Sequence, residues 1–485
     1  MKTTELFAKK SIDTLLQEAE SLNSQGLTRS LSVFNLTALG VGAIIGAGIF
    51  VLTGQVAATY TGPSIVLSFI LAAVGCALVG LCYAEFASMI PIAGSAYTYA
   101  YATLGELLAW IIGWNLVLEY LFSASTIAVG WSEYMASLLQ DLGIMIPSHL
   151  LQAPMNLPAM FIVALMTVVL IIGTSKSAGV NNFIVVVKVG VILLFIFLGI
   201  AYINYNNWIP FIPENTGKFG AFGWSGIVRG AGVIFFAYIG FDAVASAAQE
   251  ARNPQQDMPI AILGSLFIST VLYICVALVL TGIVPYQQLN VSAPIAVGVN
   301  ALGSAFRWLQ LVIKIGAIAG LSSVILVFLM AQSRIVYALA KDKLLPFQFS
   351  SIHPQFKTPH VASIASGIVA IILAGLLPIN LLMELVSIGT LLTFLMISIA
   401  VLILHRTQPD LHRPFKTPLV PFVPILGALI SGVEMLTFSI DTWLRLVGWI
   451  LLGLLIYFAY SRKNSTLNSK SELQAESEPI TSEGV

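Results

Sequence analysis

The stretch GVGAIIGAGIF, residues 40–50, decides how this chain is interpreted. It lies within a long apolar run, yet it carries glycine repeatedly, and each glycine weakens a helix by about 1 kcal/mol relative to alanine. In lipid, unwound backbone is tolerated only where protein buries it or a wet cavity solvates it. The stretch therefore predicts either a membrane helix that is interrupted at mid-depth or a helix in which Gly42 and Gly46 pack closely against a neighbour.

A second apolar run, over residues 226–249, contains a comparable interruption. It reads FFAYIGFD at residues 235–242, where Gly240 and Asp242 break an otherwise apolar helix. A carboxylate at the centre of a membrane helix costs about 2.5–3.5 kcal/mol on insertion scales, so Asp242 is expected to face protein or water. Interrupted segments at corresponding positions of two halves of a membrane protein indicate the binding site of a transporter.

The composition places the rest of the chain in a membrane. Hydrophobic residues make up 58% of the 485 residues and charged residues 9%, whereas soluble domains contain roughly 45–50% and 25%. Lipid must cover the surplus apolar surface. Since a spanning helix needs about 20 apolar residues, we predict an all-α membrane protein with about twelve transmembrane helices. The spans are expected at residues 33–58, 65–88, 105–132, 158–174, 181–204, 226–249, 260–283, 308–340, 361–378, 383–404, 421–440 and 443–461.

The charged residues predict an orientation and few further partners. With the N-terminus inside, only Lys218, Arg229, Arg307 and Arg445 of the 22 lysine and arginine residues face outward. Because such charges accumulate on the cytoplasmic side, we expect a multi-pass protein of the cell inner membrane with both termini cytoplasmic. The net charge of zero gives no sign of a nucleic-acid partner. The 3 cysteines lie in apolar runs and the 5 histidines in loops or at span edges, so neither a disulfide framework, a metal site nor a cofactor is expected.

Together, the two interruptions suit a small zwitterion. Free N–H groups at half-helix N-termini favour a carboxylate, and the carbonyl groups of unwound backbone favour an ammonium. A small-molecule amino acid is therefore the expected substrate. We expect backbone N–H groups of Ala47 and Gly48 to bind the carboxylate, carbonyl groups near Phe236, Ala237 and Ile239 to bind the amine, and the Phe236 ring to act as a gate. The predicted substrate-binding residues are Ile44, Gly46, Ala47, Gly48, Phe236, Ala237 and Ile239.

Longer motifs carry a family resemblance. They are GAGIF at residues 46–50, YAEF at 83–86, GSAY at 94–97, FD at 241–242 and RNPQ at 252–255. With these motifs the chain, over residues 27–462, resembles the bacterial branch of the cationic amino acid transporter family, in the amino acid–polyamine–organocation superfamily. The resemblance implies alternating access, amino acid substrates, and a core of five plus five helices in an inverted repeat. Many relatives have Ser or Thr in place of Ala47, so one hydroxyl contact to the substrate is missing here.

The residue pattern at the two ends, and the resemblance for the part between them, divide the chain. Residues 1–32 are predicted to be a cytoplasmic segment with a short amphipathic helix, and residues 33–404 the ten-helix inverted-repeat transport core. Residues 405–462 would form two additional transmembrane helices, and residues 463–485 a disordered cytoplasmic tail.

Charged residues within the predicted spans are candidates for proton coupling. Burial disfavours the charged form of Lys188, and the resemblance places this lysine against the interrupted first span, where it would hold carbonyl groups near Gly42 and Ala43. The alternative is a side chain that reaches the cytoplasmic face. Glu119 and Asp242 are the deepest carboxylates. They would line the binding cavity or relay a proton; alternatively, they satisfy structural partners.

These observations predict a secondary active amino acid permease that is coupled to protons and is not an enzyme. The nearest alternative is an exchanger of amino acids without proton coupling. An intramembrane enzyme is disfavoured because Asp242 alone and histidines in loops do not supply paired catalytic residues. A channel is disfavoured because two interrupted helices suit an occluded site, and no Walker motif suggests an ATP-driven pump.

Overall fold

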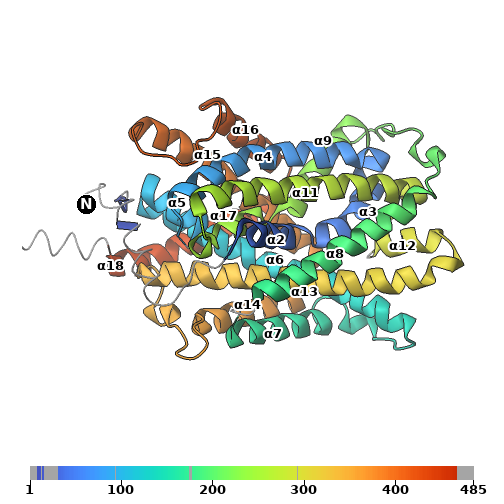
Figure 1. Ribbon diagram of the computed structural model, residues 1–485, viewed down its shortest axis with the longest axis horizontal. Coiled ribbons are helices and arrows are strands. Elements are labelled where there is room, and N and C mark those ends of the chain that lie inside the picture. The colour runs from blue at the N-terminus through green and yellow to red at the C-terminus, as the bar shows by residue number, and fades with distance from the viewer. Residues whose placement is uncertain are drawn as a thin grey trace, which may run out of the picture.

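The computed structural model describes residues 8–11, 14–15, 31–92, 94–173, 177–291 and 293–466. Within these ranges the regular structure is helical, apart from one isolated parallel bridge between Leu31 and Ala251. Most long helices run along the longest axis of the molecule (Figure 1). The α-helices are α2 (Val33–Ile44), α3 (Thr53–Val56), α4 (Ile65–Met89), α5 (Ser95–Thr103), α6 (Glu106–Asp141), α7 (Leu157–Ile172), α8 (Ser177–Ile200), α9 (Gly223–Ile234), α10 (Phe241–Ala245), α11 (Pro254–Ile283), α12 (Pro294–Ala301), α13 (Arg307–Lys341), α14 (His360–Leu376), α15 (Ile379–Thr407), α16 (Phe422–Leu436), α17 (Ile440–Ile456) and α18 (Arg462–Asn464).

Several of these helices can cross a membrane. Among the described residues, 8 helical stretches are long and apolar enough to do so, and α7, α14 and α16 are shorter apolar helices. The first stretch, Val33–Met89, covers two of the predicted spans; Gly62, with φ +64°, marks the turn between them. The protein is therefore a multi-pass membrane protein, while the count of twelve spans and the inverted repeat remain predictions.

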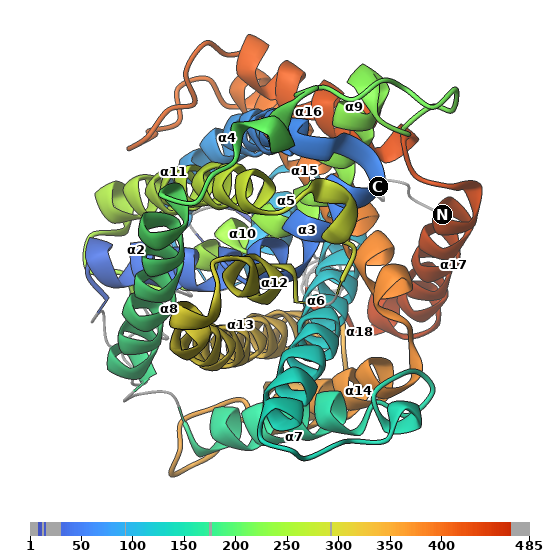
Figure 2. The same ribbon diagram turned by 90° about the vertical axis from the view of Figure 1, so that its right-hand side faces the viewer.

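The interrupted segments lie inside the bundle. Helix α6 packs against α13, α15, α14 and α7, and α11 packs against α4 and α2. Viewed along the long axis, α3 and α10 lie within a ring that includes α4, α11, α8, α13 and α6 (Figure 2). The short helices α3 and α10 are thus enclosed by longer helices, where lipid does not reach their backbone.

The outer helices present apolar side chains outward. Phe183 and Phe197 of α8 are 69% and 71% exposed, and Leu455 of α17 is 66% exposed. A soluble protein would not leave rows of large apolar side chains in water. This surface fits the lipid contact that the composition predicts.

The sequence interpretation missed two short helices. Helix α5 is made of SAYTYAYAT and α12 of PIAVGVNA, and both are too short to span a bilayer. Helix α6 extends to Asp141, beyond the predicted end at residue 132. Of the N-terminal segment predicted to contain an amphipathic helix, residues 1–7, 12–13 and 16–30 fall outside the described residues, as do residues 467–485 of the predicted tail.

Both end segments of the described chain attach to one end of the bundle, in a group of contacts that we call the terminal clasp. The ammonium of Lys10 lies 2.9 Å from a carboxylate oxygen of Asp342, just after α13. The carboxylate of Glu106, at the start of α6, accepts hydrogen bonds from the hydroxyl groups of Tyr457 (2.9 Å) and Ser465. Two buried or half-buried carboxylates thereby hold chain segments that are far apart in sequence.

Candidate functional site

The first interruption lies between Ile44 and Gly48. Helix α2 ends at Ile44, and Ile45 leaves the helical region with φ −75° and ψ 92°. Winding resumes at Gly48 as a π-helical turn, η1 (Gly48–Leu52). The first N–H groups of a helix have no partner within it. The start of η1 therefore places backbone N–H groups without a helical partner in the interior of the protein.

The second interruption lies between Tyr238 and Phe241. After α9, the chain forms a 3-10 turn, η6 (Phe235–Tyr238), and Ile239 turns to an extended conformation with ψ 135°. Gly240 has φ 123°, a left-handed conformation that side chains disfavour. Helix α10 then begins at Phe241. Glycine is needed at residue 240 because a residue with a side chain rarely adopts this positive φ.

The two interrupted segments lie directly against each other. A Cβ atom on Gly48 would be 2.3 Å from the Cβ atom of Ala237, and one on Gly240 would be 2.9 Å from the carbonyl carbon of Ala43. Side-chain atoms do not approach this closely, so the backbones themselves are in contact. Gly46 packs on Val324 of α13, at 3.4 Å by the same construction. The structure thus brings all the predicted substrate-binding residues to one buried place.

Lys188 holds the end of α2. This residue of α8 is fully buried, and its ammonium donates hydrogen bonds to the carbonyl oxygens of Gly42 at 2.6 Å and Ile45 at 3.0 Å. Carbonyl groups at a helix end have no partner within the helix, so the lysine satisfies two of them. The side chain does not run to the membrane surface, and its position agrees with the contact that the family resemblance implies.

Tyr273 of α11 joins the two interruptions, and the sequence interpretation missed it. Its buried hydroxyl lies 2.7 Å from the carbonyl oxygen of Ile44 and 2.7 Å from that of Ala237. A tyrosine hydroxyl has one proton, so it donates to one of these oxygens at a time. The sequence signal was one tyrosine within the mostly apolar run STVLYICV, residues 269–276.

Asp242 stabilises the second interruption. One carboxylate oxygen accepts a hydrogen bond from the backbone N–H of Gly240 at 3.1 Å, and the other accepts from the hydroxyl of Tyr120 at 2.7 Å. Both oxygens therefore have a donor, and Tyr120 links the interruption to α6. These contacts match the structural alternative for Asp242, in which its carboxylate accepts a hydrogen bond from a backbone N–H group.

Glu119 lies next to Tyr120, and its hydrogen bonding differs from that of Asp242. Its side chain is fully buried, and neither carboxylate oxygen has a hydrogen-bond partner among the described residues. Asp242 and the hydroxyl of Thr390 are the neighbouring polar groups. A buried carboxyl group without a donor is costly, so the position of Glu119 needs an explanation.

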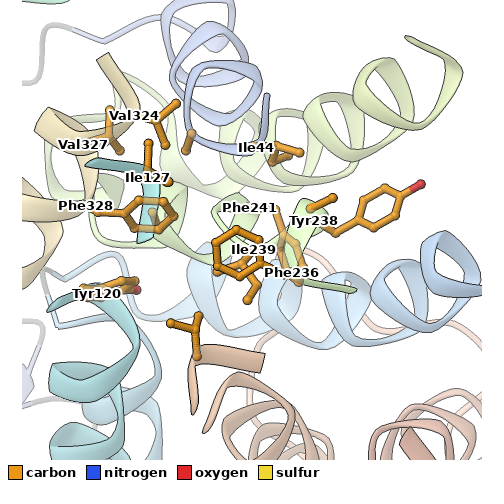
Figure 3. Packing of buried hydrophobic residues seen from close by; sticks show 14 of the residues in the cluster. Ile44, Tyr120, Ile127, Phe236, Tyr238, Ile239, Phe241, Val324, Val327 and Phe328 are labelled. Carbon is orange, nitrogen blue, oxygen red and sulfur yellow. The ribbon is translucent and has the colours of Figure 1, made fainter. Parts of the chain in front are cut away.

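Apolar side chains make up the surroundings of the interruptions. Ile44, Phe236 and Ile239 are buried, with 2%, 5% and 3% of their surfaces exposed. Figure 3 shows them in one cluster with side chains of α6 and α13. The labelled neighbours from those two helices are Tyr120, Ile127, Val324, Val327 and Phe328. The described site thus combines backbone polar groups with apolar walls.

This arrangement offers polar groups for binding a small molecule. It presents backbone donors and acceptors at two interruptions, one lysine and two carboxyl groups, all buried. No group of three or more metal-binding side chains occurs among the described residues.

Comparison with known proteins shows the family of the chain. The sequence model of the amino acid permease family matches residues 31–456. A methylthioribose transporter of Bacillus subtilis is 46% identical over 470 residues, which cover 96% of this chain and 99% of that protein. A branched-chain amino acid permease of the same organism is 44% identical over 473 residues, covering 96% and 99%.

A plant relative extends the comparison. The vacuolar cationic amino acid transporter 4 of Arabidopsis thaliana is 40% identical over 395 residues, which cover 79% of this chain and 64% of that protein. All of these relatives are transporters or permeases, so the chain is a transport protein and not an enzyme. The chain belongs to the amino acid permease family of the amino acid–polyamine–organocation superfamily.

Proposed function

We propose that this protein is a secondary active permease that carries a neutral, apolar amino acid across the cell inner membrane together with a proton. The observation that carries the proposal is the direct contact of Gly48 with Ala237 and of Gly240 with Ala43. This contact brings the backbones of the two interruptions together, and we propose that N–H groups of the first and carbonyl groups of the second bind one substrate molecule. A zwitterion needs both kinds of group at one point.

In this proposal the backbone binds both charges of the substrate. The N–H groups of Ala47 and Gly48 bind the carboxylate. The amine is bound by carbonyl groups of the second interruption, where the oxygen of Ala237 accepts from Tyr273 in the structure. When the hydroxyl proton of Tyr273 points to Ile44 instead, the Ala237 oxygen becomes free for the amine, and Phe236 covers the occupied site.

An apolar substrate side chain is supported by two observations. The walls contributed by Ile44, Phe236, Ile239 and the neighbouring part of α13 are apolar. The branched-chain amino acid permease is also 44% identical over nearly the whole chain. Such walls would contact a leucine or isoleucine side chain in the substrate-bound protein, and each buried CH₂ group would contribute about 0.8 kcal/mol to binding.

Proton coupling is assigned to Lys188 and Glu119. A charged Lys188 holds the carbonyl groups of Gly42 and Ile45; loss of its proton would release the end of α2 and allow the interrupted helix to move. Glu119, with no donor among the described residues, is the proposed relay. About twelve spans with an inverted-repeat core and cytoplasmic termini complete the proposal.

The test is uptake of radiolabelled leucine by proteoliposomes with an acidic exterior. We expect accumulation that a protonophore abolishes and that unlabelled isoleucine competes, while arginine does not. If uptake requires an amino acid inside the vesicles and ignores the pH gradient, the protein is an exchanger and the proton-coupling part is wrong.

Methylthioribose is a second candidate substrate, favoured by the 46% identity to a methylthioribose transporter. This sugar has neither a carboxylate nor an amine and would use hydroxyl contacts at the same interruptions. A competition panel containing leucine and methylthioribose distinguishes the two. Uptake of methylthioribose without uptake of leucine would overturn the amino acid assignment.

A further inference from the structure

The segment between α15 and α16 is anchored to α4 by hydrogen bonds. A buried carboxylate of α4, Glu85, accepts hydrogen bonds there from the Arg413 side chain at 3.0 Å and from the backbone N–H of Thr417 at 2.8 Å. The ring nitrogen Nε2 of His405 lies 2.7 Å from the same carboxylate. Glu85 is completely buried, so these contacts attach the segment to the interior of the bundle.

A cavity of about 350 Å³ lies beside this anchor. Its lining residues are His405, Lys416, Thr417, Pro418, Leu419 and Val420. The charge of Glu85 is already matched by the guanidinium of Arg413. Lys416, which is exposed, forms no ion pair with any residue that the structure describes. The cavity therefore carries a positive charge that protein groups do not neutralise.

An exposed apolar surface continues from the cavity along α16. Leu419 is 76% exposed and Phe422, the first residue of α16, is 68% exposed. Further along the helix, Leu426 and Leu429 are 48% and 57% exposed. Figure 1 shows α16 at the outer edge of the bundle, so this surface faces lipid in a membrane. A cavity with one lysine in its lining is thus joined to an apolar strip.

We propose that this cavity binds the phosphate headgroup of an anionic phospholipid, with Lys416 as the charged contact and an acyl chain along Phe422, Leu426 and Leu429. The site lies at the end of the bundle that holds the terminal clasp, since Glu85 is close to the end of α4 that leads into α5. We expect that end to be cytoplasmic, and basic groups there attract anionic headgroups. The site is separate from the proposed transport site, so the two proposals can fail independently.

The experiment uses the full chain, purified in detergent, and measures its unfolding midpoint during titration with phosphatidylglycerol. Lys416→Gln removes one charge and is expected to weaken the apparent affinity about fivefold, the factor that corresponds to about 1 kcal/mol for a basic residue near a headgroup. Lys416→Arg should bind like the unmodified protein. Lys463→Gln, which changes an exposed lysine of α18, is the matched control and should also leave the titration unchanged.

Parallel titrations with phosphatidylcholine and with inorganic phosphate identify the ligand. We expect neither to raise the midpoint at the concentrations at which phosphatidylglycerol does. The proposal is overturned if Lys416→Gln titrates like the unmodified protein or if Lys463→Gln weakens binding equally. An equal effect of phosphate alone would also overturn it, because the site would then bind a free anion.

Discussion

The ammonium of Lys188 lies 2.6 Å from the carbonyl oxygen of Gly42, in the last turn of a helix that ends two residues later. A fully buried cation has few ways to recover the hydration that it loses. Here the end of α2 supplies carbonyl oxygens in place of water. The charge state of one side chain is thereby connected to the winding of the segment that is proposed to bind the substrate.

The first prediction concerns that connection. Lys188→Ala should abolish leucine accumulation driven by a pH gradient while changing leucine binding much less, because the lysine contacts the helix end and not the substrate. Paired measurements of uptake and of equilibrium binding in proteoliposomes check this. Gradient-driven uptake at the unmodified level in the variant would remove Lys188 from the mechanism.

The second prediction concerns the contact of Gly48 with Ala237. Gly48→Leu should block binding, and even Gly48→Ala should destabilise the protein by about 1–3 kcal/mol because its methyl group would overlap Ala237. The double variant Gly48→Ala with Ala237→Gly should recover part of the lost binding. Gly448→Ala in α17 is the control, since a Cβ atom there meets nothing within 4 Å.

Leucine affinity measured by a scintillation proximity assay decides this second case. Unchanged affinity in Gly48→Leu would mean that the glycines serve helix packing only. A double variant no better than Gly48→Ala would mean that the two residues are not coupled.

The third prediction concerns Tyr273. Tyr273→Phe removes the hydroxyl near the carbonyl oxygens of Ile44 and Ala237 and keeps the ring. A hydrogen bond of this kind contributes about 0.5–1.5 kcal/mol, so the dissociation constant for leucine should change about two- to tenfold. Tyr202→Phe, at a half-exposed position in the loop after α8, should bind leucine as the unmodified protein does. Equal affinities in both variants would contradict the role given to Tyr273.

The fourth prediction separates Glu119 from other buried carboxyl groups. Glu119→Gln should retain leucine binding but lose proton-driven accumulation, because an amide has the shape of the acid but cannot relay a proton. Glu434 in α16 is the control, since it is buried and its carboxylate oxygens also lack partners among the described residues. Glu434→Gln should accumulate leucine normally. If both variants lose accumulation, the loss follows from removing any buried carboxyl group, and the proposed relay role of Glu119 is wrong.

Local composition predicted the positions of the interruptions because the cause is local. Glycine at residues 46, 48 and 240 permits backbone contact or a left-handed conformation wherever the rest of the chain lies. The apolar runs likewise predicted most helices to within a few residues, since lipid requires a minimum length. The placement of Lys188 came from the family resemblance and not from its neighbours in sequence.

Other parts of the site depend on contacts between distant segments. Tyr273 is separated from Ile44 by more than two hundred residues, and in sequence it is one tyrosine in an apolar run. The pairing of Asp242 with Tyr120 is hidden for the same reason. Helices α5 and α12 were not predicted because they are too short to show the apolar run of a membrane span. Tertiary packing decides whether such segments are helical.

The terminal clasp limits where reporters can be attached. A fusion joined immediately before Lys10 or at Ser465 would pull on groups that Asp342 and Glu106 hold, and so would strain the ends of α13 and α6. Additions beyond Thr466 leave these contacts intact. The same geometry offers an optical readout: dyes placed beside Lys10 and on the outer face of α13 would change their energy transfer if this end of the bundle opens during a transport cycle.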